Sequence, residues 1–340
     1  MSPHKILIVK PSSLGDIVHS LPFLNALSKC FPEAKIHWVV AQGFEELLEG
    51  HPMIHKLWII KKDSWKNIRY ARHTIREVNL LLRELKQEKY DLVIDLQGLL
   101  RSGAITGATG APLRIGFKEA REGSRVFYTH TVEGGNDIHA VDRYLKIAEF
   151  WGCNISEIRF PFPSIEHSSS FNPHPSPFLS IDSYAVLVPG ARWKTKRWPA
   201  EQFGKLASLL PVRTVIVGSR SDSGIADEIV ALSKGKSLSL AGKTDLRDLV
   251  NIMNGAQFVV SNDSGPMHIA AALGIPVFAI FGPTDPVRTG PYGKGHTIIR
   301  SSETCAPCFR RSCDDTKCMN GLKAEEVFKI IASKQNISES

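Results

Sequence analysis

The sequence lacks a run of apolar residues long enough to cross a bilayer. The longest run, residues 269–281, is interrupted by Gly274 and Pro276, whereas a transmembrane helix needs about 20 predominantly apolar residues. Residues 1–16 alternate like a strand and carry Lys10 where a signal peptide would have an unbroken apolar stretch. We therefore expect a protein of the cytoplasm.

Cysteine is scarce, because six residues in a chain of 340 are too few for a disulfide framework. Four of them nevertheless lie close together as Cys305, Cys308, Cys313 and Cys318. Clustered thiolates are typical zinc ligands, but the spacing C-x2-C-x4-C-x4-C matches no standard zinc finger or ribbon. We expect free reduced thiols, with a structural zinc site at these four residues as the alternative.

Three ligand-binding motifs are also missing. The sequence contains neither G-x-x-x-x-G-K-S/T nor G-x-G-x-x-G, so a P-loop enzyme and an ordinary dinucleotide-binding protein are both disfavoured. No two aspartates are separated by a single residue, and nothing therefore indicates a metal-bridged diphosphate. We expect no metal and no required cofactor.

The chain does have an ordinary globular composition, with 43% apolar and 22% charged residues. Its length suits about two domains. Lysine and arginine exceed aspartate and glutamate by 42 to 34, a net charge of +8. This excess favours anionic partners such as nucleotides, phosphorylated glycolipids or nucleic acid.

Short β-branched runs alternate with helical patterns along the whole chain, which is typical of a parallel sheet with crossover helices. In the first half we expect strands at 5–10, 35–40, 56–60 and 91–96, and helices at 17–30, 67–87 and 138–151. In the second half we expect strands at 185–188, 214–217, 258–261 and 277–281, and helices at 200–210, 225–233, 246–254, 267–273 and 324–334.

A segment rich in proline and serine, residues 161–177, separates the two halves. We expect a first domain at 1–165, a second at 178–322, and a C-terminal helical segment at 323–340 that is a candidate to cross back onto the first domain. The fold class is therefore two doubly wound α/β halves. Ligands of such sheets lie beyond the carboxyl ends of the strands, so facing halves would form one cleft.

The sequence S-N-D-S-G-P-M-H at 261–268 follows one of these strands and opens a helix. Gly265 and Pro266 suit a helix start that a ligand can approach closely, and such a start favours a phosphate or diphosphate. Ser264 adds a hydroxyl, and His268 lies one turn further along. The alternative is that Asp263 or Ser264 only caps the helix and His268 lies in the core.

A second strand runs into P-G-A-R-W-K-T-K-R-W-P at 189–199, which has four cations within six residues. Lysine or arginine on such a loop can neutralise the charge that grows on a diphosphate leaving group. The alternative is a solvated basic loop.

In the first half, the strand at 5–10 ends in P-S-S-L-G-D at 11–16. Asp16 could accept a proton from an attacking hydroxyl, although the spacing alone favours a simple N-cap. Lys10 and His19 are near enough in sequence to bind an anion or to tune this carboxylate. Pro22 predicts a kink or a late start in the following helix.

Further basic residues alternate with tryptophans around 58–72, and others occur at Arg101, Arg121 and Arg125. They suit a phosphorylated membrane glycolipid or nucleic acid equally well, or they form a solvated helix face. Because no signature of a nucleic-acid-binding module accompanies them, we expect no nucleic-acid partner.

Several motifs occur in the order found in ADP-heptose:lipopolysaccharide heptosyltransferases, and together they resemble that family. They are I-V-K-P-S-S-L-G-D-I-V-H at 8–19, Y-D-L-V-I-D-L-Q-G-L at 90–99, K-R-W-P at 196–199, D-S-G-P-M-H at 263–268 and F-G-P-T-D-P at 281–286. The resemblance extends from residue 5 to about residue 330.

This resemblance implies a GT-B glycosyltransferase with two Rossmann-like domains facing across a cleft. It implies an inverting, metal-independent transfer of L-glycero-D-manno-heptose from ADP-heptose to the lipopolysaccharide inner core. Asp16 would activate the acceptor hydroxyl, and Lys196 would stabilise the departing diphosphate. The implied donor contacts are Arg192, Asp222, Lys243, Asp263, Ser264, Gly265 and His268, and the implied acceptor contacts are Lys10, Ser13, His19, Lys61, Lys62 and Arg121.

Segments 38–44, 97–99 and 120–122 look more like heptosyltransferase I, whose acceptor is Kdo. Ala191, Arg192 and the cysteine cluster look more like heptosyltransferase II, which adds heptose to heptose. We expect the first enzyme, acting as a monomer on Kdo-lipid A at the cytoplasmic face of the inner membrane, and keep the second as the alternative. A nucleotide-sugar epimerase of GT-B fold and a metal-stapled nucleic-acid-binding protein are more distant alternatives.

Overall fold

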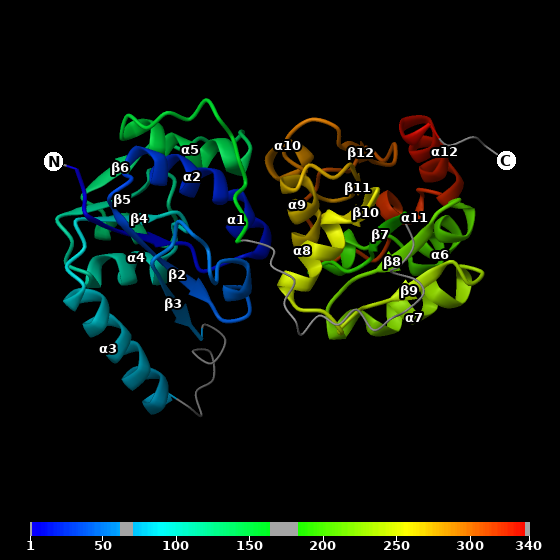
Figure 1. Ribbon diagram of the computed structural model, residues 1–340. Coiled ribbons are helices and arrows are strands. Elements are labelled where there is room, and N and C mark those ends of the chain that lie inside the picture. The colour runs from blue at the N-terminus through cyan, green and yellow to red at the C-terminus, as the bar shows by residue number, and fades with distance from the viewer. Residues whose placement is uncertain (1, 62–70, 164–182, 337–340) are drawn as a thin grey trace. The chain divides into compact units, whose positions relative to one another are not determined.

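The computed structural model describes residues 2–61, 71–163 and 183–336. The chain divides into two compact units, Met1–Ser164 and Ile165–Ser340 (Figure 1). The division falls inside the segment rich in proline and serine at 161–177. Each unit contains one parallel sheet with helices on both faces.

The first sheet has six parallel strands in the order β3-β2-β1-β4-β5-β6. They are β1 (Lys5–Val9), β2 (Lys35–Ala41), β3 (Lys56–Ile60), β4 (Leu92–Asp95), β5 (Leu113–Phe117) and β6 (His130–Val132). The central strand β1 buries its apolar residues on both sides, as a strand covered by helices on both faces requires. The strand order reverses between β1 and β4, and this switch point is where such sheets bind ligands.

Helices α1 (Leu14–His19), α2 (Leu21–Cys30) and α5 (Ala140–Phe150) lie on one face of this sheet, and α3 (Ala71–Gln87) and α4 (Leu100–Ala108) lie on the other (Figure 1). The helix predicted at 17–30 is two helices separated at Ser20, because Pro22 occupies the first turn of α2. The first of them begins at Leu14, which places Asp16 inside a helical turn.

The second sheet repeats this plan, with parallel strands in the order β12-β11-β10-β7-β8-β9. They are β7 (Tyr184–Val188), β8 (Arg213–Ile216), β9 (Ser237–Ser239), β10 (Phe258–Asn262), β11 (Val277–Ile280) and β12 (Thr297–Ile299). Counted from its own first strand, β7, the order is that of the first sheet. The switch point here lies between β7 and β10.

Helices α6 (Ala200–Leu209), α7 (Ser223–Leu232) and α12 (Ala324–Gln335) cover one face of the second sheet, and α8 (Leu246–Asn254) and α9 (Gly265–Ala272) cover the other. Two short helices, α10 (Pro286–Thr289) and α11 (Lys317–Asn320), lie in the connections after β11 and β12. Both sheets thus have the doubly wound α/β arrangement that the alternating pattern predicts.

The C-terminal helix α12, a candidate from sequence to cross back onto the first domain, packs against α6 of its own unit. Val327 and Ile331 are fully buried in the core of the second unit. The amide of Ala324 donates to Gln202 Oε1 at 2.9 Å, and Lys205 pairs with Glu325 at 2.7 Å. The apolar stripe of α12 therefore stabilises the second unit.

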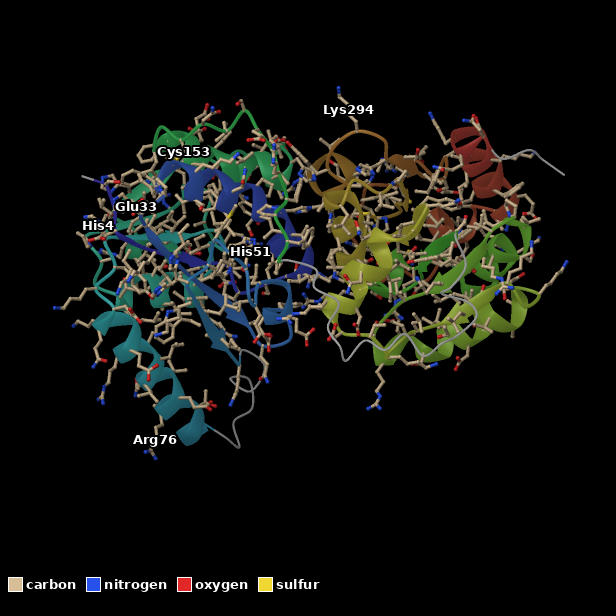
Figure 2. All side chains as sticks on the ribbon, in the orientation of Figure 1. His4, Glu33, His51, Arg76, Cys153 and Lys294 are labelled. Carbon is tan, nitrogen blue, oxygen red and sulfur yellow. A yellow bond between two sulfur atoms is a disulfide. The ribbon has the colours of Figure 1, made fainter. Side chains whose placement is uncertain are left out.

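A disulfide joins Cys30 at the end of α2 to Cys153 beyond α5, with the two Cα atoms 5.3 Å apart (Figure 2, which labels Cys153). The two cysteines of this pair are 123 residues apart, and their pairing was not predicted from the sequence. Among the described residues, the structure contains no helix with the length and apolar character needed to span a membrane.

Candidate active site

The turn from β1 into α1 presents Asp16 at the switch point of the first sheet. Ser13 is the N-cap of α1, and its amide and hydroxyl donate to Asp16 Oδ2 at 2.9 and 2.7 Å. The helix is therefore capped by Ser13 with Asp16 as its third residue, and Asp16 is not the N-cap itself. The side chain of Asp16 remains 36% exposed, so the carboxylate can be reached from outside the protein.

The second oxygen of Asp16 meets two groups from distant parts of the chain. The hydroxyl of Tyr144, on α5, donates to Oδ1 at 3.1 Å, and Lys10 Nζ lies 3.7 Å from the same atom. Burial alone would raise the pKa of Asp16, but the Lys10 ammonium and the hydrogen bonds from Ser13 and Tyr144 outweigh it and hold the pKa below its ordinary value. Asp16 is thus an ionised carboxylate at neutral pH.

Lys10 is buried, so its ammonium faces the protein interior. Its Nζ donates to the carbonyl of Leu96 at 3.4 Å and lies 5.0 Å from the centre of the Tyr144 ring. Burial lowers the pKa of Lys10, while Asp16 and Asp95 raise it in part. Lys10, a predicted acceptor contact, therefore contacts Asp16 in the structure. Ser13, predicted for the same role, is exposed.

His19 is buried at the end of α1, with its ring 4.9 Å from that of His139 in an edge-to-face arrangement. Lys61 follows β3, is exposed, and pairs with Glu77 of α3 at 3.3 Å. Lys62 lies outside the described residues. The structure therefore leaves the acceptor roles of these three residues as predictions.

The turn from β4 into α4 lies beside the Asp16 turn, because β1 and β4 are neighbours. Its buried carboxylate, Asp95, accepts hydrogen bonds from the amides of Gln97 and Gly98 and from the hydroxyls of Ser102 and Tyr128. Burial raises the pKa of Asp95 despite these four donors. Asp95 therefore acts as a structural anchor for the turn.

The turn anchored by Asp95 is hydrogen-bonded to two neighbouring segments. Gln97 Oε1 accepts from the amide of Ser12 at 3.3 Å, which connects this turn to the Asp16 turn. The carbonyl of Gly98 accepts from the amide of Arg121 at 2.9 Å. The side chain of Arg121 is exposed, and its role as an acceptor contact stays a prediction.

Replacing Tyr144 with phenylalanine tests this network. Since the Tyr144 hydroxyl donates only to the ionised form of Asp16, its loss should raise the pKa of that carboxyl group. Because its native pKa lies below the ordinary value, Asp16 stabilises the fold at pH values above that ordinary pKa. This contribution is lost as the pH falls through the native pKa. Titration of the Asp16 carboxyl carbon by NMR should show the upward shift, and an unchanged titration would mean that Tyr144 does not tune the base.

The second unit joins its two switch-point turns through Lys196 and Asp263. Lys196 follows β7 and Asp263 follows β10, and their Nζ and Oδ2 atoms lie 2.6 Å apart. The hydroxyl of Thr284, beyond β11, donates to the same oxygen at 2.6 Å. The indole ring of Trp193 lies 4.6 Å from Lys196 Nζ. The cation is thus held in one place by a carboxylate that is itself buried.

Asn262, which the sequence analysis did not single out as a site residue, fixes the basic turn at both ends. Its Nδ2 donates to the carbonyl of Pro189 at 2.8 Å, and its Oδ1 accepts from the amide of Trp198 at 3.1 Å. Asn262 is completely buried at the end of β10. The shape of the segment at 189–199 therefore depends on this one amide side chain.

The start of α9 is open to an anion. Ser264 is its N-cap, but no side chain makes a capping hydrogen bond there, and Ser264 Oγ lies 3.3 Å from Ser261 Oγ. Gly265 and Pro266 form the first turn, and His268 is buried one turn further on. Ser264 occupies the N-cap position without a side-chain hydrogen bond, so side-chain capping, one part of the alternative, is absent, whereas the expected burial of His268 is present. The first amides of α9 thus receive no hydrogen bond from a capping side chain.

The three less certain donor contacts are arranged differently from one another. Asp222 is buried, accepts from the amide and hydroxyl of Ser219 at 2.9 and 2.6 Å, and lies 3.7 Å from the Arg197 guanidinium. Its Oδ2 thus accepts two hydrogen bonds from the protein, and its Oδ1 lies at ion-pair distance from Arg197. Arg192 and Lys243 are exposed, and Lys243 Nζ donates to the carbonyl of Ser239 at 3.2 Å. The donor roles of all three residues stay predictions.

The four clustered cysteines have free thiols in the structure, with only Cys318 buried. Within the described ranges 2–61, 71–163 and 183–336, no group of three metal-ligating side chains is close enough to hold an ion. Burial and the neighbouring thiols raise the pKa of Cys318. Whether these cysteines bind zinc thus stays a prediction.

Two Rossmann-type sheets in one chain, each with polar groups gathered at its switch point, are the architecture of the GT-B class. Residues 78–319 match the model of glycosyltransferase family 9 (heptosyltransferase). The chain belongs to this family.

Individual relatives agree with that assignment. The chain is 31% identical to lipopolysaccharide heptosyltransferase 1 of Pseudomonas aeruginosa, over 91% of this chain and 87% of that protein. It is 29% identical to lipopolysaccharide heptosyltransferase 1 of Escherichia coli, over 87% and 93% of the two chains. The structure is similar to that of E. coli heptosyltransferase WaaC with ADP-2-deoxy-2-fluoro heptose, with a TM-score of 0.79, 26% identity and coverage of 97% and 99%.

Proposed function

We propose that this enzyme is the first heptosyltransferase of the lipopolysaccharide inner core, which transfers heptose from ADP-heptose to the Kdo of a lipid A-linked acceptor with inversion at the anomeric carbon. The observation that carries the proposal is the division of chemistry between the two switch points. The accessible, ionised carboxylate of Asp16 lies at the switch point of the first sheet. At the switch point of the second sheet, Lys196 is paired with buried Asp263, next to the start of α9, which has no side-chain cap. Similarity to two heptosyltransferase 1 proteins supports the choice of acceptor.

Asp16 is the proposed general base. An acceptor hydroxyl that displaces Ser13 or approaches the exposed side of the carboxylate would donate its proton to Asp16 as the new glycosidic bond forms. Because Lys10, Ser13 and Tyr144 lower the pKa of Asp16, the carboxylate is a weak base towards a free alcohol. Proton transfer is therefore expected late in the displacement, when bond formation has made the hydroxyl acidic. The ammonium of Lys10, 3.7 Å from Asp16 Oδ1, helps to keep Asp16 ionised, and Asp16 in turn opposes the lowering of the Lys10 pKa by burial.

Lys196 is the proposed electrostatic partner of the leaving ADP. The pair with Asp263 and the ring of Trp193 hold the ammonium in place before the donor binds, so little reorganisation is needed as negative charge develops on the diphosphate. The uncapped amides at the start of α9 add a second source of positive potential. Asp263 is thus proposed to position Lys196, with Thr284 orienting Asp263.

We propose that these groups perform the role that a metal has in other diphosphate-sugar enzymes, so that no metal and no cofactor is required. Lysine, arginine and helix N-terminal amides are sufficient to bind and neutralise a diphosphate. The activity of the purified enzyme should therefore persist in excess EDTA.

The proposed enzyme works as a monomer at the cytoplasmic surface of the inner membrane, where a lipid A-linked acceptor would be held. Three apolar side chains on α3 and α4, Ile75, Leu80 and Leu100, are exposed, which supports this location. A groove of about 300 Å³ lies between the same helices and is lined in part by Arg101. Arg76, which extends away from α3 in Figure 2, is also exposed. Exposed apolar side chains and cations on the same helices are suited to an anionic lipid surface.

Leu80→Glu should weaken binding to vesicles that contain phosphatidylglycerol by at least about fivefold, since it replaces an exposed apolar side chain with a charge that repels anionic headgroups. Co-sedimentation with vesicles measures this effect. Leu209→Glu, on the exposed side of α6, is the matched control and should bind as the native protein does. Equal binding by both variants would place the membrane contact elsewhere.

A transfer assay with two acceptors tests the proposed function. Purified protein and ADP-heptose are incubated with Kdo2-lipid A, with the heptosylated form of that lipid, or with no acceptor, and the products are identified by mass spectrometry. We expect ADP release and one added heptose with the first acceptor only. Addition to the heptosylated lipid alone would indicate heptosyltransferase II, and conversion of the sugar nucleotide without acceptor would indicate an epimerase.

A further inference from the structure

The cysteine-rich loop at 305–318 has no role in the reaction as described so far, yet it is attached to the basic turn that carries Lys196. Thr195, the residue before Lys196, donates its hydroxyl to the carbonyl of Arg310 at 2.9 Å. The amide of Phe309 donates to the carbonyl of Pro283 at 2.7 Å, next to the Thr284 that orients Asp263. The loop is therefore joined to both sides of the leaving-group site.

The far end of the loop is fixed in the core of the second unit. Cys318 and Met319 are buried there. They pack so closely on Gly282 that a Cβ at that position would lie 3.0 Å from Cys318 Sγ and 2.5 Å from Met319 Sδ. The segment before them is thus held at three places, near 195, 283 and 282, and its side chains are presented at the carboxyl edge of the second sheet.

Arg311 is the side chain that this attachment brings to the site. Its guanidinium carbon lies 5.0 Å from the centre of the Trp193 ring, and Lys196 Nζ lies 4.6 Å from the centre of the same ring. Trp193 therefore contacts two cations, of which Lys196 is already paired with Asp263. An anion that binds beside this ring would be attracted by Arg311 as well as by Lys196.

The charge balance of the turn supports a role for Arg311 in anion binding. Lys196 is neutralised by Asp263, and Arg197 lies 3.7 Å from Asp222. Within the part of the chain that the structure describes, no carboxylate lies within ion-pair distance of Arg311. A bound diphosphate carries more than one negative charge, so it needs a cation beyond the one that Asp263 already shares. Arg311 is exposed and can provide that charge.

We propose that Arg311 of the cysteine-rich loop binds the diphosphate of the nucleotide sugar, together with Lys196. This inference rests on the proposed function, because it assigns the ligand of that same site. The planar guanidinium can donate two hydrogen bonds to phosphate oxygens while it remains against the Trp193 ring. The loop thus acts as an arm of the donor site, and buried Cys318 packs at the end where the arm joins the core.

Calorimetric titration with ADP tests the proposal, with Arg310 as an internal control. Arg310 is also exposed and carries the same charge, but its described contact with the turn is made by its backbone carbonyl, which Arg310→Ala retains. Arg311→Ala should weaken ADP binding about tenfold, and Arg310→Ala should change it less than twofold. Arg311→Lys, which keeps the charge without the planar fork, should fall between the two.

The outcomes of these measurements distinguish the role of Arg311 from the proposed function of the enzyme. If the native protein binds ADP and Arg311→Ala binds it equally well, the role of Arg311 is disproved while the proposed function stands. If Arg311→Ala instead raises only the KM for Kdo2-lipid A, the arginine serves the acceptor and the proposal is overturned. If the native protein does not bind ADP, the proposed function fails and the assignment of Arg311 fails with it. Thermal unfolding of each variant identifies any loss of fold.

Discussion

Asp16→Asn should lower the rate of heptose transfer by about a thousandfold, which lies within the range that a positioned general base contributes. Asparagine has nearly the same shape as aspartate and can still accept from Ser13, but it cannot take the proton of the acceptor hydroxyl. The KM for ADP-heptose should change little, because the residues proposed to bind the donor belong to the second unit. Initial rates of ADP release at saturating acceptor measure the effect.

The same variant leaves Lys10 buried without its charged neighbour, so a loss of activity has to be distinguished from a loss of fold. Thermal unfolding followed by circular dichroism provides that control. Asp227→Asn, an exposed aspartate on α7, removes the same charge elsewhere and should retain full activity. Transfer at the native rate by a folded Asp16→Asn enzyme would exclude Asp16 as the base.

Lys196→Ala should reduce the rate constant for transfer by about 10²–10³, the loss typical when one preorganised group that stabilises developing charge is removed. The variant should also bind ADP more weakly, since the ammonium is proposed to contact the diphosphate in both the ground state and the transition state. Single-turnover measurements with ADP-heptose separate the two effects.

Lys194→Ala is the matched control for this variant, because Lys194 lies in the same turn, is exposed and carries the same charge. A purely electrostatic attraction of the whole basic turn would make the two variants equivalent. The geometry of the pair between Lys196 and Asp263 predicts that Lys194→Ala loses at most about threefold. Equal losses would mean that the position of the Lys196 ammonium has no special role.

The alternation of apolar runs and helical patterns was enough to predict two parallel α/β units, but not all of their elements. Helix α4 was missed because it contains Gly103 and Gly107, which weaken helix propensity. Both glycines are required by the ring of Phe127, whose atoms would lie within 2.8 Å of a Cβ at either position. The tertiary contact with Phe127 therefore requires glycine at both positions of this helix.

The edge strands β6, β9 and β12 were missed for a different reason. Each has three residues and pairs with a neighbour on one side only. Such strands carry too few residues to show an alternating pattern. Strand β5 was missed because Gly116 interrupts it, at a position where the ring of Tyr128 packs.

Local motifs indicated which turns carry the site, whereas the contacts within it depend on helix geometry and long-range packing. The sequence placed Ser13 and Asp16 in one turn but favoured Asp16 as the N-cap, whereas Ser13 caps the helix and Asp16 is its third residue. Tyr144 contacts Asp16 from 128 residues away, and Thr284 contacts Asp263 because β11 lies beside β10. The contacts of Asp222 with Ser219 and Arg197 depend on a turn that the sequence did not show, and its role in donor binding stays a prediction.

Calorimetric titration of the Asp16→Asn variant with ADP tests the central claim most directly, because that claim assigns donor binding to the second unit and proton removal to the first. The account predicts that this variant, with its transfer rate reduced about a thousandfold, binds ADP with an affinity within about twofold of the native value. A loss of ADP affinity that parallels the loss of transfer would contradict the division of roles between Asp16 and Lys196.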